Sequence, residues 1–190
     1  MYYVNKDGSR ETTTNSALAN KVIIGNVDPK VQGGLTNYIG WKFIDFNFTL
    51  TYSLGGHAYD YATWLQSNGG TYNYVGNVPS YYKMEETWQK PGDNAKLPQF
   101  AYGNKNINSS RWMMSTNHLR LKNMTVGFTL PQNWVRKAGI EKLRAYISGN
   151  NLLTWKSKDL YVDPEVPVDG LCTFETPALR TVTFGIELGF

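Results

Sequence analysis

The strongest constraint on the fold is an unbroken alternation of apolar and polar residues from Ile44 to Leu54. Every even-numbered position of this run is apolar or aromatic, and every odd-numbered position is polar. Because successive side chains of a strand point to opposite faces of a sheet, the run predicts a strand with one apolar and one polar face. It is about twice as long as the usual strand of five to six residues. It matches the roughly 9–11 residues that a tilted strand needs to cross a bilayer.

Other segments repeat this pattern, so we expect an all-β, antiparallel fold with about five strands. The two leucines of Leu119–Leu121 are out of phase with Met124 and Val126, which predicts a β-bulge near Lys122–Asn123. The strands are predicted at about 34–39, 43–54, 124–130, 143–153 and 179–190.

The connections between these strands alternate between long and short. A structureless connection as long as 55–117 is abnormal in a compact soluble domain, where the median is about 4–6 residues. Bacterial outer-membrane barrels instead have short periplasmic turns and longer extracellular loops. We therefore expect 55–117 and 155–178 to be extracellular, and the turn 40–42 and a short helix at 131–139 to be periplasmic.

Aromatic residues lie close to both ends of the predicted strands, as in the interfacial girdles of a membrane barrel. The alternative is that they form the core of an ordinary β-sandwich. The residues concerned are Tyr38, Trp41, Phe43 and Trp134 at one end, and Tyr52 and Trp155 at the other.

Composition excludes several classes of protein. Charged residues make up 18% of the chain and aromatic residues 14%, which argues against disorder. A single cysteine excludes a disulfide scaffold, and no apolar stretch approaches the roughly 18 residues of a transmembrane helix. The net charge of +4 is scattered, so no nucleic-acid partner is expected. The N-terminus has no signal peptide, so we expect either a cytoplasmic protein or one that lacks its N-terminal part.

The chain carries no recognisable catalytic constellation, and we expect neither an enzyme nor a bound cofactor or metal. His57 and His118 have no metal-ligand spacing, and the common hydrolase and phosphate-loop motifs are missing from the sequence. The acidic segment Asp159–Asp169 leaves calcium binding open, although a solvated surface loop is the favoured interpretation. Cys172 lies in the same connection, where we expect its thiol to be reachable from outside the cell.

The long connection 55–117 is rich in tryptophan and tyrosine. Such residues stack on sugar rings and are enriched at interfaces, but they also pack loops against themselves. We consider both roles for this set. The candidate substrate- or partner-contact residues are Trp64, Tyr72, Tyr74, Tyr81, Tyr82, Trp88 and Trp112.

Several short motifs, taken in order, resemble the C-terminal end of the SusC/RagA family of TonB-linked outer-membrane transporters. Val27 departs from this pattern, because the family often has proline there. The motifs are Ile24–Lys30 with Gly33–Gly34, Trp88 with Lys90–Asp93, Ser110–Trp112, Leu119–Asn123, Gly127–Pro131, Leu143–Arg144 with Tyr146, Ser148–Thr154, Asp163–Glu165, Arg180–Thr181 and Phe190.

The resemblance implies a 22-stranded barrel around an N-terminal plug, in the outer membrane of a Gram-negative, Bacteroidetes-like cell. Such transporters work with a SusD-like surface lipoprotein and import glycans or peptides, driven by the TonB complex. Residues 1–190 would then form one domain, the last quarter of the barrel, with signal peptide, TonB box and plug outside the chain. The rival hypothesis is a secreted carbohydrate-binding β-sandwich.

The final strand also resembles the outer-membrane assembly signal that the barrel assembly machinery reads. In that pattern a polar residue, a glycine, a hydrophobic residue and a terminal aromatic residue recur at fixed spacing. The matching residues are Thr183, Gly185, Leu188 and Phe190.

Overall fold

The computed structural model describes residues 2–4, 8–13, 15, 17–66, 80, 83–95, 97–101, 108–165 and 169–190. The chain divides into two compact units. Unit 1 comprises Met1–Val27, His57–Met114 and Val166–Glu175, and unit 2 comprises Asp28–Gly56, Ser115–Glu165 and Thr176–Phe190.

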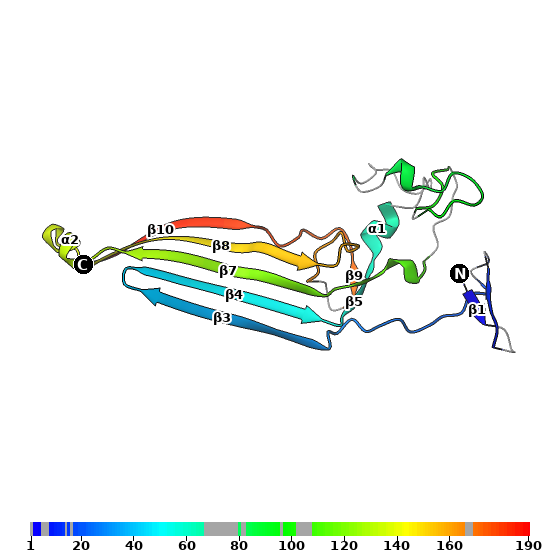
Figure 1. Ribbon diagram of the computed structural model, residues 1–190, viewed down its shortest axis with the longest axis horizontal. Coiled ribbons are helices and arrows are strands. Elements are labelled where there is room, and N and C mark those ends of the chain that lie inside the picture. Colours follow the sequence, from blue (N-terminus) through cyan, green and yellow to red (C-terminus); the bar gives the residue numbers. More distant parts are fainter. Residues whose placement is uncertain are drawn as a thin grey trace. The chain divides into compact units, whose positions relative to one another are not determined.

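Unit 2 is built on a five-stranded antiparallel sheet whose neighbours follow chain order, so each strand pairs with the next one of the sheet (Figure 1). The predicted number of strands is confirmed, and the first strand is longer than expected because it pairs with the second along its whole length. The strands are β3 (Val31–Trp41), β4 (Ile44–Leu54), β7 (His118–Thr129), β8 (Lys142–Lys156) and β10 (Thr181–Gly189).

The predicted bulge in β7 is confirmed by its pairing with β4. Leu121 pairs with Leu50 and Asn123 pairs with Thr49, so Lys122 is skipped in the register with β4. The register with β8 also shifts at this place, but there the extra residue is in β8, where residues 151 and 152 lie opposite residue 122. The extra residue in β7 returns the leucines at 119 and 121 to the apolar face, which explains why their spacing in the sequence is out of phase.

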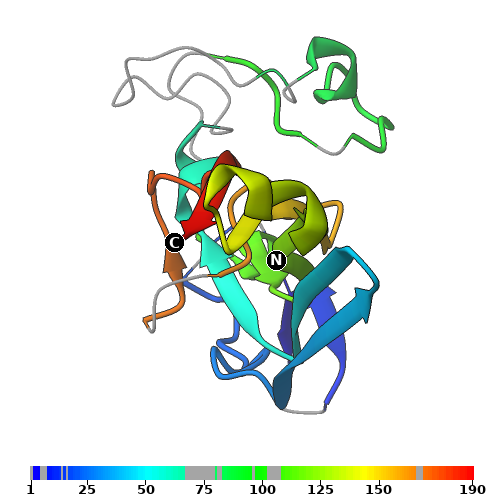
Figure 2. The same cartoon turned by 90° about the vertical axis from the view of Figure 1, so that its left-hand side faces the viewer.

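The two short connections lie at the same end of the sheet (Figures 1 and 2). β3 and β4 are joined by a tight turn in which Lys42 has a positive φ of 53°. The predicted short helix is confirmed as α2 (Gln132–Val135) followed by the 3₁₀ turn η3 (Arg136–Ala138). It ends at Gly139, whose left-handed φ of 73° is a conformation that glycine adopts without steric cost.

Unit 1 contains regular elements where the sequence predicted only irregular connections. A strand pair joins β1 (Tyr2–Val4) to β2 (Arg10–Thr12), and a small sheet has the order β6–β5–β9. Its strands are two to four residues long, too short for a periodic signal, and β9 comes more than a hundred residues after β5. The remaining elements are β5 (His57–Asp60), α1 (Tyr61–Gln66), η1 (Met84–Glu86), η2 (Ser110–Trp112), β6 (Met113–Ser115) and β9 (Leu171–Cys172).

No helix within the described ranges is long and apolar enough to cross a membrane.

Candidate functional site: the two faces of the sheet

The register of the five strands places apolar side chains in continuous rows on one face. Phe46 pairs with Val126, Val126 with Ile147, and Ile147 with Phe184, so one row crosses four strands. The neighbouring row runs from Ile44 to Ile186 through Phe128 and Ala145. Because paired residues of antiparallel strands point to the same side, these rows form one apolar face.

Large apolar side chains of this face are exposed rather than buried against another layer. On the edge strand β10 Phe184 is 78% exposed and Ile186 is 71% exposed, and on the inner strands Val126 and Ile147 are 38% and 41% exposed. A β-sandwich would bury the apolar face against a second sheet. Within the described residues of unit 2 there is one sheet, which argues against the sandwich hypothesis.

Hydroxyl and amide groups link the middle of the polar face from strand to strand. The hydroxyls of Thr36 and Thr49 lie 3.1 Å apart between β3 and β4. The Thr125 hydroxyl donates to Ser148 over 2.9 Å, and the Asn150 amide donates to Thr181 over 3.0 Å. The polar face is therefore a hydrogen-bonded surface, suited to contact with water or a polar solute.

Near the short connections, four charged residues form a network on this face. Arg144 Nε donates to Asp45 Oδ1 over 2.9 Å, and Lys142 Nζ lies 2.7 Å from Glu187 Oε1. Arg144 Nη1 also lies 3.5 Å from Glu187 Oε2. The network joins β4, β8 and β10, so it stabilises the relative positions of three strands.

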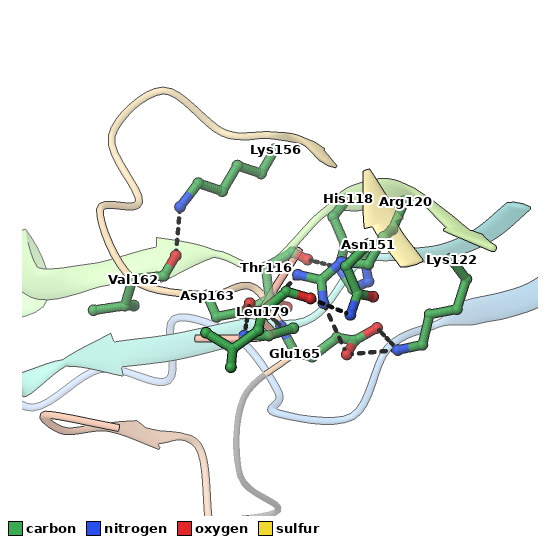
Figure 3. Close-up of polar contacts among 11 residues, drawn as sticks. Thr116, His118, Arg120, Lys122, Asn151, Lys156, Val162, Asp163, Glu165 and Leu179 are labelled. Atoms are coloured by element: carbon green, nitrogen blue, oxygen red, sulfur yellow. Dashed lines mark hydrogen bonds and ion pairs between the residues drawn. The ribbon is translucent and has the colours of Figure 1, made fainter. Parts of the chain in front are cut away.

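A second charged cluster lies where the β8–β10 connection meets the polar face (Figure 3). Arg120 Nη2 lies 2.6 Å from Asp163 Oδ1, and its Nη1 lies 3.0 Å from Glu165 Oε2. Lys122 Nζ lies 2.8 Å from Glu165 Oε1. We call Arg120, Lys122, Asp163 and Glu165 the loop cluster.

Asp163 is the centre of the loop cluster because it accepts two backbone hydrogen bonds as well. Its Oδ1 accepts from the Glu165 N–H over 2.9 Å, and its Oδ2 accepts from the Ala178 N–H over 3.1 Å. Burial alone would raise the pKa of this carboxyl. The two N–H donors and the Arg120 guanidinium outweigh burial and hold the pKa below its usual value.

The two halves of the loop cluster lie in the motifs Leu119–Asn123 and Asp163–Glu165, and the sequence did not predict their contact. The signal available was two like charges at spacing i, i+2 in each motif, basic at Arg120 and Lys122 and acidic at Asp163 and Glu165. Their partners are 43 residues apart in the chain, and nothing in the sequence specifies that contact.

The structure does not favour the calcium site that the acidic segment left open. The carboxylates of Asp163 and Glu165 are occupied by cationic side chains. In the described part of the chain, no group of three or more His, Cys, Asp or Glu side chains is arranged to hold a metal.

The aromatic contact candidates belong to unit 1, and the structure describes three of them. The rings of Trp64 and Tyr61 are 5.0 Å apart, and Trp88 is half-buried. Trp112 is only 3% exposed, and the Arg111 guanidinium lies 5.0 Å from its ring, so for Trp112 the packing role is favoured over contact with a ligand. The candidates Tyr72, Tyr74, Tyr81 and Tyr82 lie outside the described residues.

The four residues of the predicted assembly signal lie in β10 or directly after it. Thr183, Leu188 and Phe190 are exposed. Gly185 lies under the Tyr146 ring, where a Cβ atom would collide with the ring. Packing against Tyr146 is therefore enough to explain the glycine at position 185. Recognition of these four residues by the assembly machinery stays a prediction.

The expectation that Cys172 is reachable from outside is wrong. Its side chain is 3% exposed in β9, and it pairs with the fully buried Asp60 in the register. Burial raises the pKa of the thiol to about 12, with a further contribution from the Asp60 carboxylate. Because the thiolate is the reactive form, this cysteine is protected in the folded protein.

The long strands, the exposed apolar face and the hydrogen-bonded polar face are together typical of a segment of a membrane-spanning β-barrel. Solved structures agree with this class. The structure of the RagAB peptide transporter matches 99% of this chain with a TM-score of 0.80 and 25% identity. The RagAB peptide importer in its closed-closed state matches 100% of the chain with a TM-score of 0.79 and 24% identity.

Curated relatives point to the same group, although no protein-family model matches the chain. TonB-dependent receptor P3 of Formosa agariphila is 30% identical over 99% of this chain, and TonB-dependent receptor P26 of the same organism is 22% identical over 99%. The chain spans 19% of the length of each of these relatives. The resemblance seen in the motifs is thus confirmed: the chain is related to the TonB-dependent receptors, and its fold matches that of the RagAB structures.

Proposed function

We propose that this chain is the C-terminal quarter of the barrel of an outer-membrane importer that takes up glycans or peptides with energy from the TonB complex. The observation that carries the proposal is the two-faced sheet, with rows of exposed apolar side chains on one face and charged and hydroxyl groups on the other. The relatives named as TonB-dependent receptors and as a peptide importer support the same activity.

The sheet needs neighbours on both sides, and a barrel supplies them. Each of its outer strands, β3 and β10, has one strand neighbour among the described residues. In a bilayer, unpaired backbone groups cost several kcal/mol each, so spanning sheets close on themselves. Since the chain covers about a fifth of its relatives, the remaining strands of the protein would complete the barrel. The apolar face then contacts lipid and the polar face lines the lumen.

The partners follow from this placement and from the resemblance. A SusD-like surface lipoprotein would meet the extracellular connections, where Trp64 and Trp88 are the described candidates for contact with the lipoprotein or the substrate. The TonB complex would act through a plug and TonB box outside these 190 residues. The barrel assembly machinery would recognise β10 through Thr183, Gly185, Leu188 and Phe190.

The experiment is an uptake assay in the producing bacterium. A strain that lacks the full-length gene, and the same strain complemented with that gene, are each given an oligopeptide mixture and an oligosaccharide mixture. We expect the complemented strain alone to deplete one of the mixtures, and a protonophore to abolish the depletion. If neither mixture is depleted while the protein is folded in the outer membrane, nutrient import is refuted. The mixture that is depleted decides between peptides and glycans.

A further inference from the structure

The connection between β8 and β10 is attached to the polar face of the sheet at several points. Arg120 pairs in register with Thr51 and Thr154, which places it on the polar face of β7, between β4 and β8, near the end of the sheet opposite the short connections. Its guanidinium contacts both acidic residues of the connection that belong to the loop cluster. Asp163 and Glu165 therefore lie against the polar face at this end of the sheet (Figure 3).

Further hydrogen bonds attach the connection on either side of the loop cluster. Lys156 Nζ donates to the Val162 carbonyl over 2.5 Å at the end of β8. The Asn151 amide donates to the Leu179 carbonyl over 3.0 Å just before β10 begins. The Asp163 carboxylate joins the two halves, because it binds Arg120 of the sheet and the Ala178 N–H of the returning chain.

Side chains on both sides of the contact between the β8–β10 connection and the sheet are buried. Arg120 is among the most buried side chains of the protein, and Leu160 and Pro164 of the connection are buried as well. A buried guanidinium needs a paired carboxylate, since an unpaired charge in such a place is strongly destabilising. Lys122 and Glu165, by contrast, keep about two fifths of their side chains exposed, so the outer side of the loop cluster faces solvent.

We propose that Arg120 is a positioning residue that holds residues 161–165 against the inner wall of the barrel, so that this segment forms a fixed part of the import passage. This inference rests on the proposed function, because it places the polar face in the lumen. The passing substrate would then meet the exposed Lys122–Glu165 pair. Glu165 and Lys122 would then contribute to the charge of the passage wall at this end of the sheet.

The test uses the purified full-length protein in detergent, with a cysteine introduced as Leu160→Cys in a background free of other cysteines, including Cys172→Ser. A water-soluble maleimide reports whether position 160 is shielded. We expect slow labelling in the parent and at least tenfold faster labelling in Asp163→Asn and in Arg120→Gln. The double variant should label no faster than the single ones, because both remove the same contact. Arg120→Lys, which keeps the charge, should label at an intermediate rate.

Glu175→Gln is the matched control, since it makes the same kind of change in the same connection at an exposed side chain. It should label like the parent. Unchanged labelling in both Asp163→Asn and Arg120→Gln would overturn the positioning role. The heat-dependent shift in electrophoretic mobility measures the folded fraction and so identifies any variant that fails to fold. Asp163→Asn is included because Asp163 lies outside the strands, where a substitution disturbs barrel folding least.

A second readout separates a place in the passage from a role in stability alone. In cells with equal amounts of folded transporter, Asp163→Asn should raise the concentration for half-maximal uptake of the depleted mixture at least threefold. Faster labelling with an unchanged half-saturation would refute the passage role while leaving the proposed function intact. A parent that labels slowly but imports neither mixture would refute the proposed function instead.

Discussion

The guanidinium of Arg144 on β8 binds the carboxylate of Asp45 on β4 across a strand that lies between them, with Nε 2.9 Å from Oδ1. The intervening strand is β7, and it presents Gly127 at the crossing point, paired in register with Asp45 and with Tyr146. A Cβ atom at Gly127 would collide with both charged groups. The glycine is therefore required by the ion pair, and its place in the motif Gly127–Pro131 has a physical explanation.

Gly127→Ala should separate Arg144 from Asp45 and destabilise the full-length barrel by about 1–3 kcal/mol, the usual cost of overpacking a tight site. Chemical unfolding in detergent or lipid measures the change. Gly40→Ala is the control, because the nearest atoms to its Cβ belong to the exposed ring of Tyr38, at 3.3 Å. Equal stability of Gly127→Ala and the parent would mean that the ion pair does not constrain the sheet.

Substitutions at neighbouring positions of β4 should differ in cost, because they point to opposite faces. Phe48→Arg places a charge in lipid and should destabilise the full-length protein by about 2–4 kcal/mol near the bilayer midplane. Thr49→Arg should cost much less, since that side chain faces the polar side and loses mainly its contact with Thr36. An unfolding titration in lipid vesicles gives both values, and similar costs would contradict the assignment of faces.

Protonation of Asp163 should weaken the loop cluster in acid only. Its folded-state pKa lies below the unfolded value of about 3.9, so its stabilising contribution is complete above that value and is lost as the pH falls through the folded pKa. In thermal unfolding of the full-length protein, the melting temperatures of the parent and of Asp163→Asn should differ by a constant amount from pH 5 to pH 7. The difference should shrink below about pH 3.9. A difference that grows in acid would have the wrong sign for this contact.

Topology can be tested with cysteines placed at exposed positions, since Cys172 is too buried to serve. In intact cells whose full-length protein carries Cys172→Ser and no other cysteine, Phe174→Cys should react with a membrane-impermeant maleimide. Lys137→Cys should react only after the outer membrane is permeabilised, because the short helix α2 would be periplasmic. The opposite pattern would show that the sheet is inserted the other way round.

The sequence predicted the parts of the fold that depend on local periodicity. The alternation from Ile44 to Leu54 marks β4 at its observed bounds, and the phase change after Leu121 marks the bulge, because both are set by which side chain meets which face. The short helix follows from Pro131 and Gly139 in the same way.

The sequence did not predict features that depend on contacts between distant segments. The pairing of β5 with β9 joins strands of four and two residues, which carry no periodic signal. The contact of Arg120 with Asp163 and the burial of Cys172 likewise depend on where a long connection folds back. An aromatic-rich composition also could not separate Trp112, which is buried, from residues that are free to touch a ligand.

The central claim is that this sheet is part of a membrane barrel with its apolar rows in lipid and its polar face in the lumen. Nitroxide labels placed one at a time at residues 46, 47, 48 and 49 of the full-length protein in lipid bilayers test it directly. Collision rates with oxygen, which concentrates in lipid, should be high at 46 and 48 and low at 47 and 49. Collision rates with a water-soluble nickel complex should remain low at 46 and 48. A uniform pattern along the four positions, or one in the opposite phase, would contradict the account.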